Sequence, residues 1–261
     1  MDFSTIEVSC SNARGVIALN RPDKLNPLST TTLLELADAA RFFDARHEVK
    51  VVVLRGRGRA FCAGADLAAF STGDGSAPSA GALRAAADAG RLMAEAIESM
   101  RAVTVARLHG HCVGGGLVLA AACDLRVAAD DTTFAIPEVD LGIPLAWGGI
   151  PRLVREIGPA LTKELVMTCR PFSASEAHAA GFLNRVVPAA ELDSSVEALV
   201  SQLESKSPLT LSATKRHVNA VTEGMVHTAR AWNDADSLVT ALRDPESRAV
   251  AAAYLNRFAA T

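Results

Sequence analysis

The stretch "GGGLVLAAACDLRVAADDTTFAIPEVDLGI", residues 114–143, carries most of the features that decide the fold. Three glycines stand where an apolar helix begins, and the later runs "DLRVAA" and "TTFAI" are typical of short buried strands. Glycines at such a turn let a ligand approach the backbone closely, and the helix start favours negative charge. One glutamate, Glu138, follows a proline, while the first helical turn carries Val118. The stretch therefore predicts an α/β fold with a site wall that has a single glutamate.

The composition is that of a globular protein that can bury a substantial core. The chain has 261 residues, 49% of them apolar and 21% charged, with a net charge of −3. This balance gives no reason to expect nucleic acid or an anionic membrane as a partner. The uncharged run 112–123 is too short to span a bilayer, and the first ten residues lack a signal-peptide pattern. We therefore expect a cytoplasmic protein.

The sequence gives no pattern for a metal or a separate cofactor. Its five cysteines are scattered without a C-x-x-C pair, which favours reduced thiols over disulfides or a zinc site. The glycines lack the spacing of a dinucleotide-binding turn, and we find no P-loop lysine, G-x-S-x-G or H-E-x-x-H. The glycine motif alone could also be a tight packing turn between a strand and a helix.

Strands and helices alternate along the first half of the chain. The expected elements are a hairpin over 6–20, a helix from Ser29 to about Arg46, a buried strand over 49–56, a mobile polar segment over 71–81, a helix over about 82–100 and a strand over 103–108. From Gly149 onward the sequence reads as almost wholly helical, with a capping box at Ser173–Glu176.

Two further motifs accompany the glycines. "RAFCAGADL", residues 59–67, leaves the buried strand as a small-residue loop, the kind of place where ligand contacts collect in α/β folds. "FAIPEVDLGIPLAWGGIPRL", residues 134–153, places Glu138 among apolar neighbours, and burial there should raise its pKa towards neutral pH. Taken singly, the first could be an ordinary turn and the second a surface carboxylate.

In this order and spacing, the motifs resemble the crotonase (enoyl-CoA hydratase/isomerase) superfamily, and the resemblance extends from "LNRPDKLNPL" to the helical "SATK" region. It implies an α/β spiral of ββα units over residues 1–195 and a C-terminal helical trimerisation region over 196–261. It also implies an acyl-CoA thioester substrate and assembly as a homotrimer or a dimer of trimers.

The resemblance further assigns roles to individual residues. The backbone N–H groups of Ala65 and Gly115 would form an oxyanion hole for the thioester oxygen, and Glu138 would be the catalytic acid–base group. The other residues expected to contact the substrate are Lys24, Leu25, Ala63, Asp66, Leu67, Ala68, Gly114, Val118, Ala146 and Trp147.

One carboxylate of the family pattern is missing. Hydratases of the family hold a water between two glutamates, and here the first of these positions is Val118. Dienoyl-CoA isomerases of the family place aspartates at that position and at Ala146, where the hydratases have a glycine; bulky Trp147 follows. A single acid above an oxyanion hole suits proton shuttling from 3-enoyl-CoA to 2-enoyl-CoA, as in family members with an apolar residue at the first position.

Other functions remain open at this point. They are a slow or broad enoyl-CoA hydratase in fatty-acid degradation, an acyl-CoA decarboxylase or hydrolase, and a non-catalytic acyl-CoA-binding protein. RNA binding is disfavoured by the acidic balance.

Several other polar residues have a structural explanation that we favour over a catalytic one. His109 is expected to end a strand, and Asp124 to end a helix and bond local backbone. His111 could reach the cavity mouth, although a hydrogen-bonded structural role is favoured. Asp140 should point away from Glu138 along an extended segment, and Cys62 lacks a partner histidine.

Overall fold

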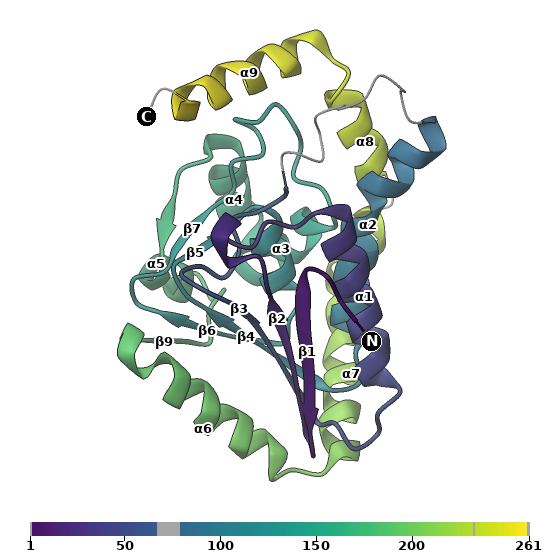
Figure 1. Ribbon diagram of the computed structural model, residues 1–261, viewed down its shortest axis with the longest axis vertical. Helices are drawn as coiled ribbons and strands as arrows, with labels where there is room; N and C mark the ends of the chain where they lie inside the picture. The colour runs from purple at the N-terminus through teal and green to yellow at the C-terminus, as the bar shows by residue number, and fades with distance from the viewer. Residues whose placement is uncertain (1, 67–78, 232, 260–261) are drawn as a thin grey trace.

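The computed structural model describes residues 2–66, 79–231 and 233–259, which form two β-sheets surrounded by helices (Figure 1). The strands are β1 (Ile6–Ser11), β2 (Arg14–Leu19), β3 (Val51–Gly56), β4 (Val103–Leu108), β5 (His111–Val113), β6 (Leu125–Ala129), β7 (Thr133–Ala135), β8 (Phe172–Ser173) and β9 (Arg185–Val187). The helices are α1 (Thr30–Asp44), α2 (Ala80–Ser99), α3 (Gly115–Ala121), α4 (Gly149–Thr168), α5 (Ala174–Ala179), α6 (Leu192–Glu204), α7 (Pro208–Met225), α8 (Asp234–Ala241) and α9 (Pro245–Ala259), with 3-10 turns η1 (Pro22–Lys24), η3 (Ala189–Glu191) and η4 (Thr228–Ala231).

The larger sheet has the order β1-β2-β3-β4-β6-β9. β1 and β2 form an antiparallel hairpin, and every later neighbour in this sheet is parallel. The smaller sheet, β5-β7-β8, lies beside it and holds the strand that leads into α3 (Figure 1). Parallel strands need crossover helices that cover their faces, which accounts for the continuous apolar run of β3.

Both faces of the larger sheet are covered. On one face, α1 and α2 contribute the fully buried side chains of Leu36, Phe43 and Ile97 to the main core. On the other, α6 packs an apolar stripe against the valines of β3, β4 and β6 (Figure 1). The sheet is therefore a rigid base for the loops that follow its strands.

Most of the expected elements are confirmed. The hairpin is present, and α1 begins after Ser29, whose hydroxyl accepts a hydrogen bond from the Thr32 amide. The helix expected from residue 82 starts at Ala80, with Ser79 as its cap. The rest of the segment for which we predicted mobility, 71–78, lies outside the described residues.

Two expectations for the second half are corrected. The region after Gly149 is helical as expected except for two short strands: β8 pairs with β7, and β9 extends the larger sheet by pairing with β6. The capping box at Ser173 forms only in part: the serine hydroxyl caps the Glu176 amide, while the Glu176 carboxylate pairs with Arg170 at 2.6 Å. The division of the chain at residue 195 stays a prediction.

Candidate active site

The glycine turn after β5 brings the start of α3 against Glu138. Gly114 has φ 50° and ψ −117°, a backbone conformation that side chains disfavour, and its amide donates to the Ala135 carbonyl of β7 at 2.9 Å. A β-carbon on Gly114 would lie 2.4 Å from the Glu138 Oε1 atom. Only a glycine therefore allows the carboxyl group to lie against this turn.

The loop after β3 supplies a second backbone edge. Leu28 forms an isolated parallel bridge with Ala65, in which its amide donates to Gly64 at 2.8 Å and its carbonyl accepts from Asp66 at 3.0 Å. This pattern turns the Ala65 N–H away from Leu28, and the Gly115 N–H has no carbonyl one helical turn before it. Within the described chain neither amide donates a hydrogen bond, so both are free to donate to a bound group.

Ala65 and Gly115 both line a small cavity together with the predicted acid. It has a volume of about 20 Å³, room for about one water molecule. Its lining residues are Ala65, Gly115, Val118, Glu138, Ile143, Pro144, Leu145, Ala146, Trp147 and Leu238. Among these, Glu138 is the one ionisable side chain. The structure thus brings together six of the predicted residues: the two amide donors, the acid, Val118, Ala146 and Trp147.

Glu138 is buried without a counter-ion. It is 8% exposed, and its Oε2 atom has no hydrogen-bond partner among the described residues. Burial disfavours the charged carboxylate and raises the pKa of Glu138 to about 7, an effect that a bond from its own amide partly offsets. A carboxyl group with such a pKa can both take and return a proton near neutral pH.

The cavity position occupied by Val118 is apolar. Val118, on the first turn of α3, is fully buried and lines the same cavity. Ala146 and Trp147 line it from the segment that leads into α4. The sequence carries no second acid at Val118 or Ala146, and among the described residues no other acid lines the cavity.

The remaining predicted contacts lie on neighbouring loops. Lys24 is exposed at the end of η1, Leu25 accepts the Ala63 amide at 2.9 Å, and Asp66 pairs with Arg21 at 2.6 Å. Of the described residues in this group, none lines the cavity around Glu138. Gly114 does not line it either, but contacts the carboxyl group from behind. Leu67 and Ala68 lie outside the described residues.

The alternative acid–base and nucleophilic candidates do not line the cavity. His109 contacts Arg107 and the Gly58 carbonyl, both at 2.9 Å. The His111 ring is exposed and makes no hydrogen bond among the described residues, so the hydrogen-bonded role favoured for it is not found. Cys62 is fully buried, and desolvation raises the pKa of its thiol to about 12, which keeps it uncharged.

Two of the acids behave differently from our expectation. Asp124 bonds the Thr104 amide at 2.7 Å and pairs with Lys215 at 2.7 Å, so its contacts are distant in sequence rather than local. Asp140 is exposed while Glu138 is buried, so the two side chains do point apart, but the reason given was wrong. Residues two apart on an extended segment share a face, and Glu138 instead begins a turn, closed by the bond from the Leu141 amide to the Pro137 carbonyl.

Two contributions to the site were missed. Asn26 is buried, and its carboxamide donates to the carbonyls of Arg57 and Ala60 at 2.9 Å, which orders the loop before Cys62. A polar residue between two prolines was the available signal. The second is helix α8, which places Leu238 at the cavity. No pattern in the sequence around Leu238 predicts this contact.

The described parts of the chain contain no group of three or more His, Cys, Asp or Glu side chains placed to hold a metal ion. None of the helices in these parts has the length and apolarity to span a membrane.

Comparison with known proteins identifies the family of the chain. A family model described as enoyl-CoA hydratase/isomerase matches residues 10–259. The peroxisomal Δ(3,5)-Δ(2,4)-dienoyl-CoA isomerase of Arabidopsis thaliana is 34% identical, covering 98% of this chain and 96% of its own length. The crotonyl-CoA hydratase of Syntrophomonas wolfei is also 34% identical, covering 86% of this chain and 84% of its own length.

Solved structures with a similar fold include an enoyl-CoA hydratase. The crystal structure of an enoyl-CoA hydratase from Mycobacterium avium subsp. paratuberculosis matches with a TM-score of 0.87 and 24% identity, covering 97% of this chain and 99% of that one. This likeness confirms the predicted crotonase-like α/β architecture. Because the family model matches residues 10–259, nearly the whole chain, the chain belongs to the enoyl-CoA hydratase/isomerase family.

Proposed function

We propose that the protein isomerises 3-enoyl-CoA to 2-enoyl-CoA, with Glu138 as the proton shuttle. The observation that carries this proposal is a lone, unpaired buried carboxyl group in a cavity that also holds the free amides of Ala65 and Gly115. No separate cofactor is needed, since coenzyme A is part of the substrate. Family membership supports, as a further proposal, assembly as a homotrimer or a dimer of trimers.

The proposed reaction moves one proton and one double bond. Ionised Glu138 takes a proton from C2, and the electron pair of the broken C–H bond gives a dienolate whose negative charge rests on the thioester oxygen. The Ala65 and Gly115 amides donate to that oxygen, a contribution of about 10²–10³ in rate for one such donor. The Glu138 carboxyl then returns the proton to C4, which leaves the double bond between C2 and C3 and regenerates the carboxylate.

Hydration is the second candidate, because a curated relative is a crotonyl-CoA hydratase. Hydration requires activation of a water and delivery of a proton to C2, and each group that assists such a transfer contributes about 10²–10⁴ in rate. Val118 can do neither, and it makes its side of the cavity apolar. The cavity therefore favours transfer of a proton within the substrate.

The direct test compares two reactions with the purified protein. We expect conversion of 3-enoyl-CoA to 2-enoyl-CoA to exceed hydration of 2-enoyl-CoA by about 10²-fold or more in kcat/KM, since one of two acid–base groups is absent. Formation of the conjugated thioester and of the 3-hydroxy product would be followed separately by absorbance and mass spectrometry. Faster hydration than isomerisation would contradict the proposal.

A valine-to-glutamate exchange provides the converse test. If the missing acid limits hydration, Val118→Glu should raise hydratase activity, with Val118→Gln as the control of similar size. An unchanged rate in a folded Val118→Glu variant would place the obstacle at Ala146 and Trp147 instead.

The isomerase should lose activity in acid. Burial raises the pKa of Glu138 from 4.5 to about 7, and the proposed base must be ionised before it can act. We therefore expect kcat/KM to rise with pH below about 7 and to level off above it. A profile that is flat down to about pH 5, with melting curves confirming a folded protein throughout, would exclude Glu138 as the base.

A further inference from the structure

The indole of Trp147 fills the space between two helices of the site. A β-carbon on Gly90 of α2 would lie 2.1 Å from the indole Cγ atom, and one on Gly115 of α3 would lie 2.2 Å from Cζ3. The ring therefore lies directly against both glycines, and Trp147 is only 8% exposed. A bulkier residue at Gly90 or Gly115 would have no room beside this ring.

The backbone of Trp147 is held in an unusual conformation. Its φ is 62°, in the left-handed region that a bulky residue rarely adopts, so the surrounding structure must hold it there. On one side, the Gly149 amide donates to the Ala146 carbonyl at 3.0 Å. On the other, the Gly148 amide donates to the Asp234 carboxylate of α8 at 2.8 Å.

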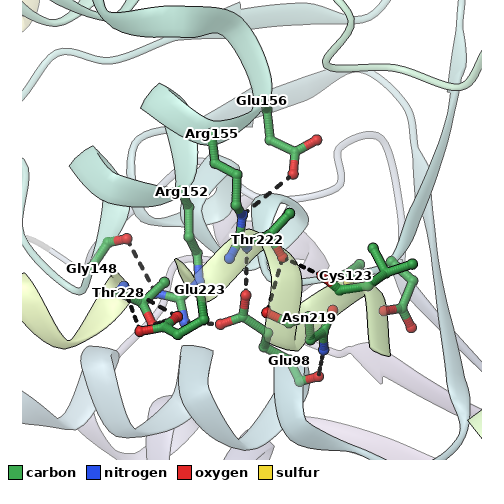
Figure 2. Close-up of polar contacts among 12 residues, drawn as sticks. Glu98, Cys123, Gly148, Arg152, Arg155, Glu156, Asn219, Thr222, Glu223 and Thr228 are labelled. Atoms are coloured by element: carbon green, nitrogen blue, oxygen red, sulfur yellow. Dashed lines mark hydrogen bonds and ion pairs between the residues drawn. The ribbon is translucent and has the colours of Figure 1, made fainter. Parts of the chain in front are cut away.

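A buried ion pair completes this support. Arg152, fully buried, donates through Nη1 to the Gly148 carbonyl at 3.1 Å and through Nη2 to Glu98 at 2.5 Å (Figure 2). Glu98 also pairs with Arg155, so α2, the Trp147 turn and α4 are joined in one network. The indole is thus a fixed wall and not a side chain free to swing aside.

This wall borders the space beside Glu138. Trp147 and Leu238 line the same space as Glu138 and the two amides, and only about 20 Å³ remains. That volume is about one water molecule, so an acyl chain of any length must extend along these walls or displace them, and Trp147 is the bulkiest of the lining residues.

We infer that Trp147 is the residue that determines acyl-chain length, closing the pocket so that the site takes short-chain acyl-CoA thioesters. This inference rests on the proposed function, because it places the acyl group of a 3-enoyl-CoA in the cavity beside Glu138. A residue that only packed the core would affect stability without affecting the choice of substrate.

The test is a chain-length series with the full-length protein. The kcat/KM for 3-enoyl-CoA would be measured from butenoyl to dodecenoyl for the wild type, Trp147→Phe and Trp147→Ala. We expect the wild type to fall about 10-fold or more between hexenoyl and decenoyl, and Trp147→Ala to raise the decenoyl-to-hexenoyl ratio by about 10–100-fold. Trp147→Phe, which keeps an aromatic wall, should lie between them.

Binding measurements separate this inference from the proposed reaction. The Kd of saturated butyryl-CoA and decanoyl-CoA, by calorimetry, reports the length of the pocket whether or not the protein isomerises anything. Suppose that the protein does not convert 3-enoyl-CoA to 2-enoyl-CoA, but that Trp147→Ala lowers the Kd of decanoyl-CoA relative to that of butyryl-CoA. The isomerase proposal then fails and the chain-length assignment stands. A wild type that binds both chains equally, or a ratio that Trp147→Ala leaves unchanged, overturns the assignment.

A second variant keeps the test valid if Trp147→Ala folds poorly. Gly115→Ala places a methyl group 2.2 Å from the indole Cζ3 atom, so it should lower the melting temperature of the wild type. The same change in a Trp147→Phe background should lower it less, because a phenyl ring does not reach the outer edge of the indole. Equal effects in both backgrounds would mean that the indole does not occupy the space beside Gly115, and would remove the geometric basis of the assignment.

Discussion

Replacing Glu138 with glutamine should reduce isomerase activity by at least about 10²–10⁴-fold, because the amide cannot take a proton and no other ionisable side chain of the described residues lines the cavity. Asp140→Asn is the matched control: it removes an exposed carboxylate two residues away and should leave the rate near that of the wild type. The measurement is kcat/KM with 3-enoyl-CoA. Turnover that survives Glu138→Gln would contradict the proposed mechanism.

The same variant should be more stable than the wild type in neutral or alkaline solution. Burial raises the pKa of Glu138 from 4.5 to about 7, so the folded protein binds this proton more tightly than the unfolded chain does. Stability therefore falls as pH rises from about 4.5 to about 7, by up to about 3 kcal/mol for this group. Glutamine removes that cost above pH 7 but gains nothing below pH 4.5. Urea unfolding at both extremes would reveal the difference.

Gly114→Ala should damage both folding and activity. Its β-carbon would lie 2.4 Å from Glu138 Oε1, and alanine disfavours the positive φ of this turn. We expect a loss of about 1–3 kcal/mol in unfolding free energy from backbone strain. Activity should fall about 10²-fold or more, because the clash displaces the proposed base by around an ångström.

Gly158→Ala separates these two effects. Gly158 also has a positive φ, of 75°, but a β-carbon there would meet nothing within 4 Å. The Gly158→Ala variant should have a lower free energy of unfolding than the wild type but the same kcat/KM. If Gly114→Ala were as active as Gly158→Ala, the close approach of the Gly114 turn to Glu138 would have no functional role.

The parts of the fold that the sequence predicted are those with strong local patterns. The valine run of β3, the serine that caps α1 and the glycine-to-proline–glutamate stretch each carry their signal within a few residues. Strand β9 was not predicted, because three residues are too few to show the alternation of a strand. Its pairing with β6 also joins residues about sixty positions apart in the sequence.

The site divides in the same way. Glu138, Val118, Ala65 and Gly115 were predicted from motifs, and the cavity brings all four together. The contributions of Leu238 and Asp234 could not be predicted from the sequence, because their contacts depend on how α8 packs against α2 and not on any local sequence pattern. The roles of these residues in catalysis remain predictions for the experiments above.

Because α8 lies late in the chain, the pocket can be completed only near the end of synthesis. The chain leaves the ribosome N-terminus first, at about 5–20 residues per second. The amide pair and Glu138 emerge well before Asp234 and Leu238, so a nascent chain would hold an unfinished pocket, with Trp147 lacking its support from α8. Premature termination before α8 should consequently yield a protein that retains every proposed catalytic group yet has an incompletely walled pocket.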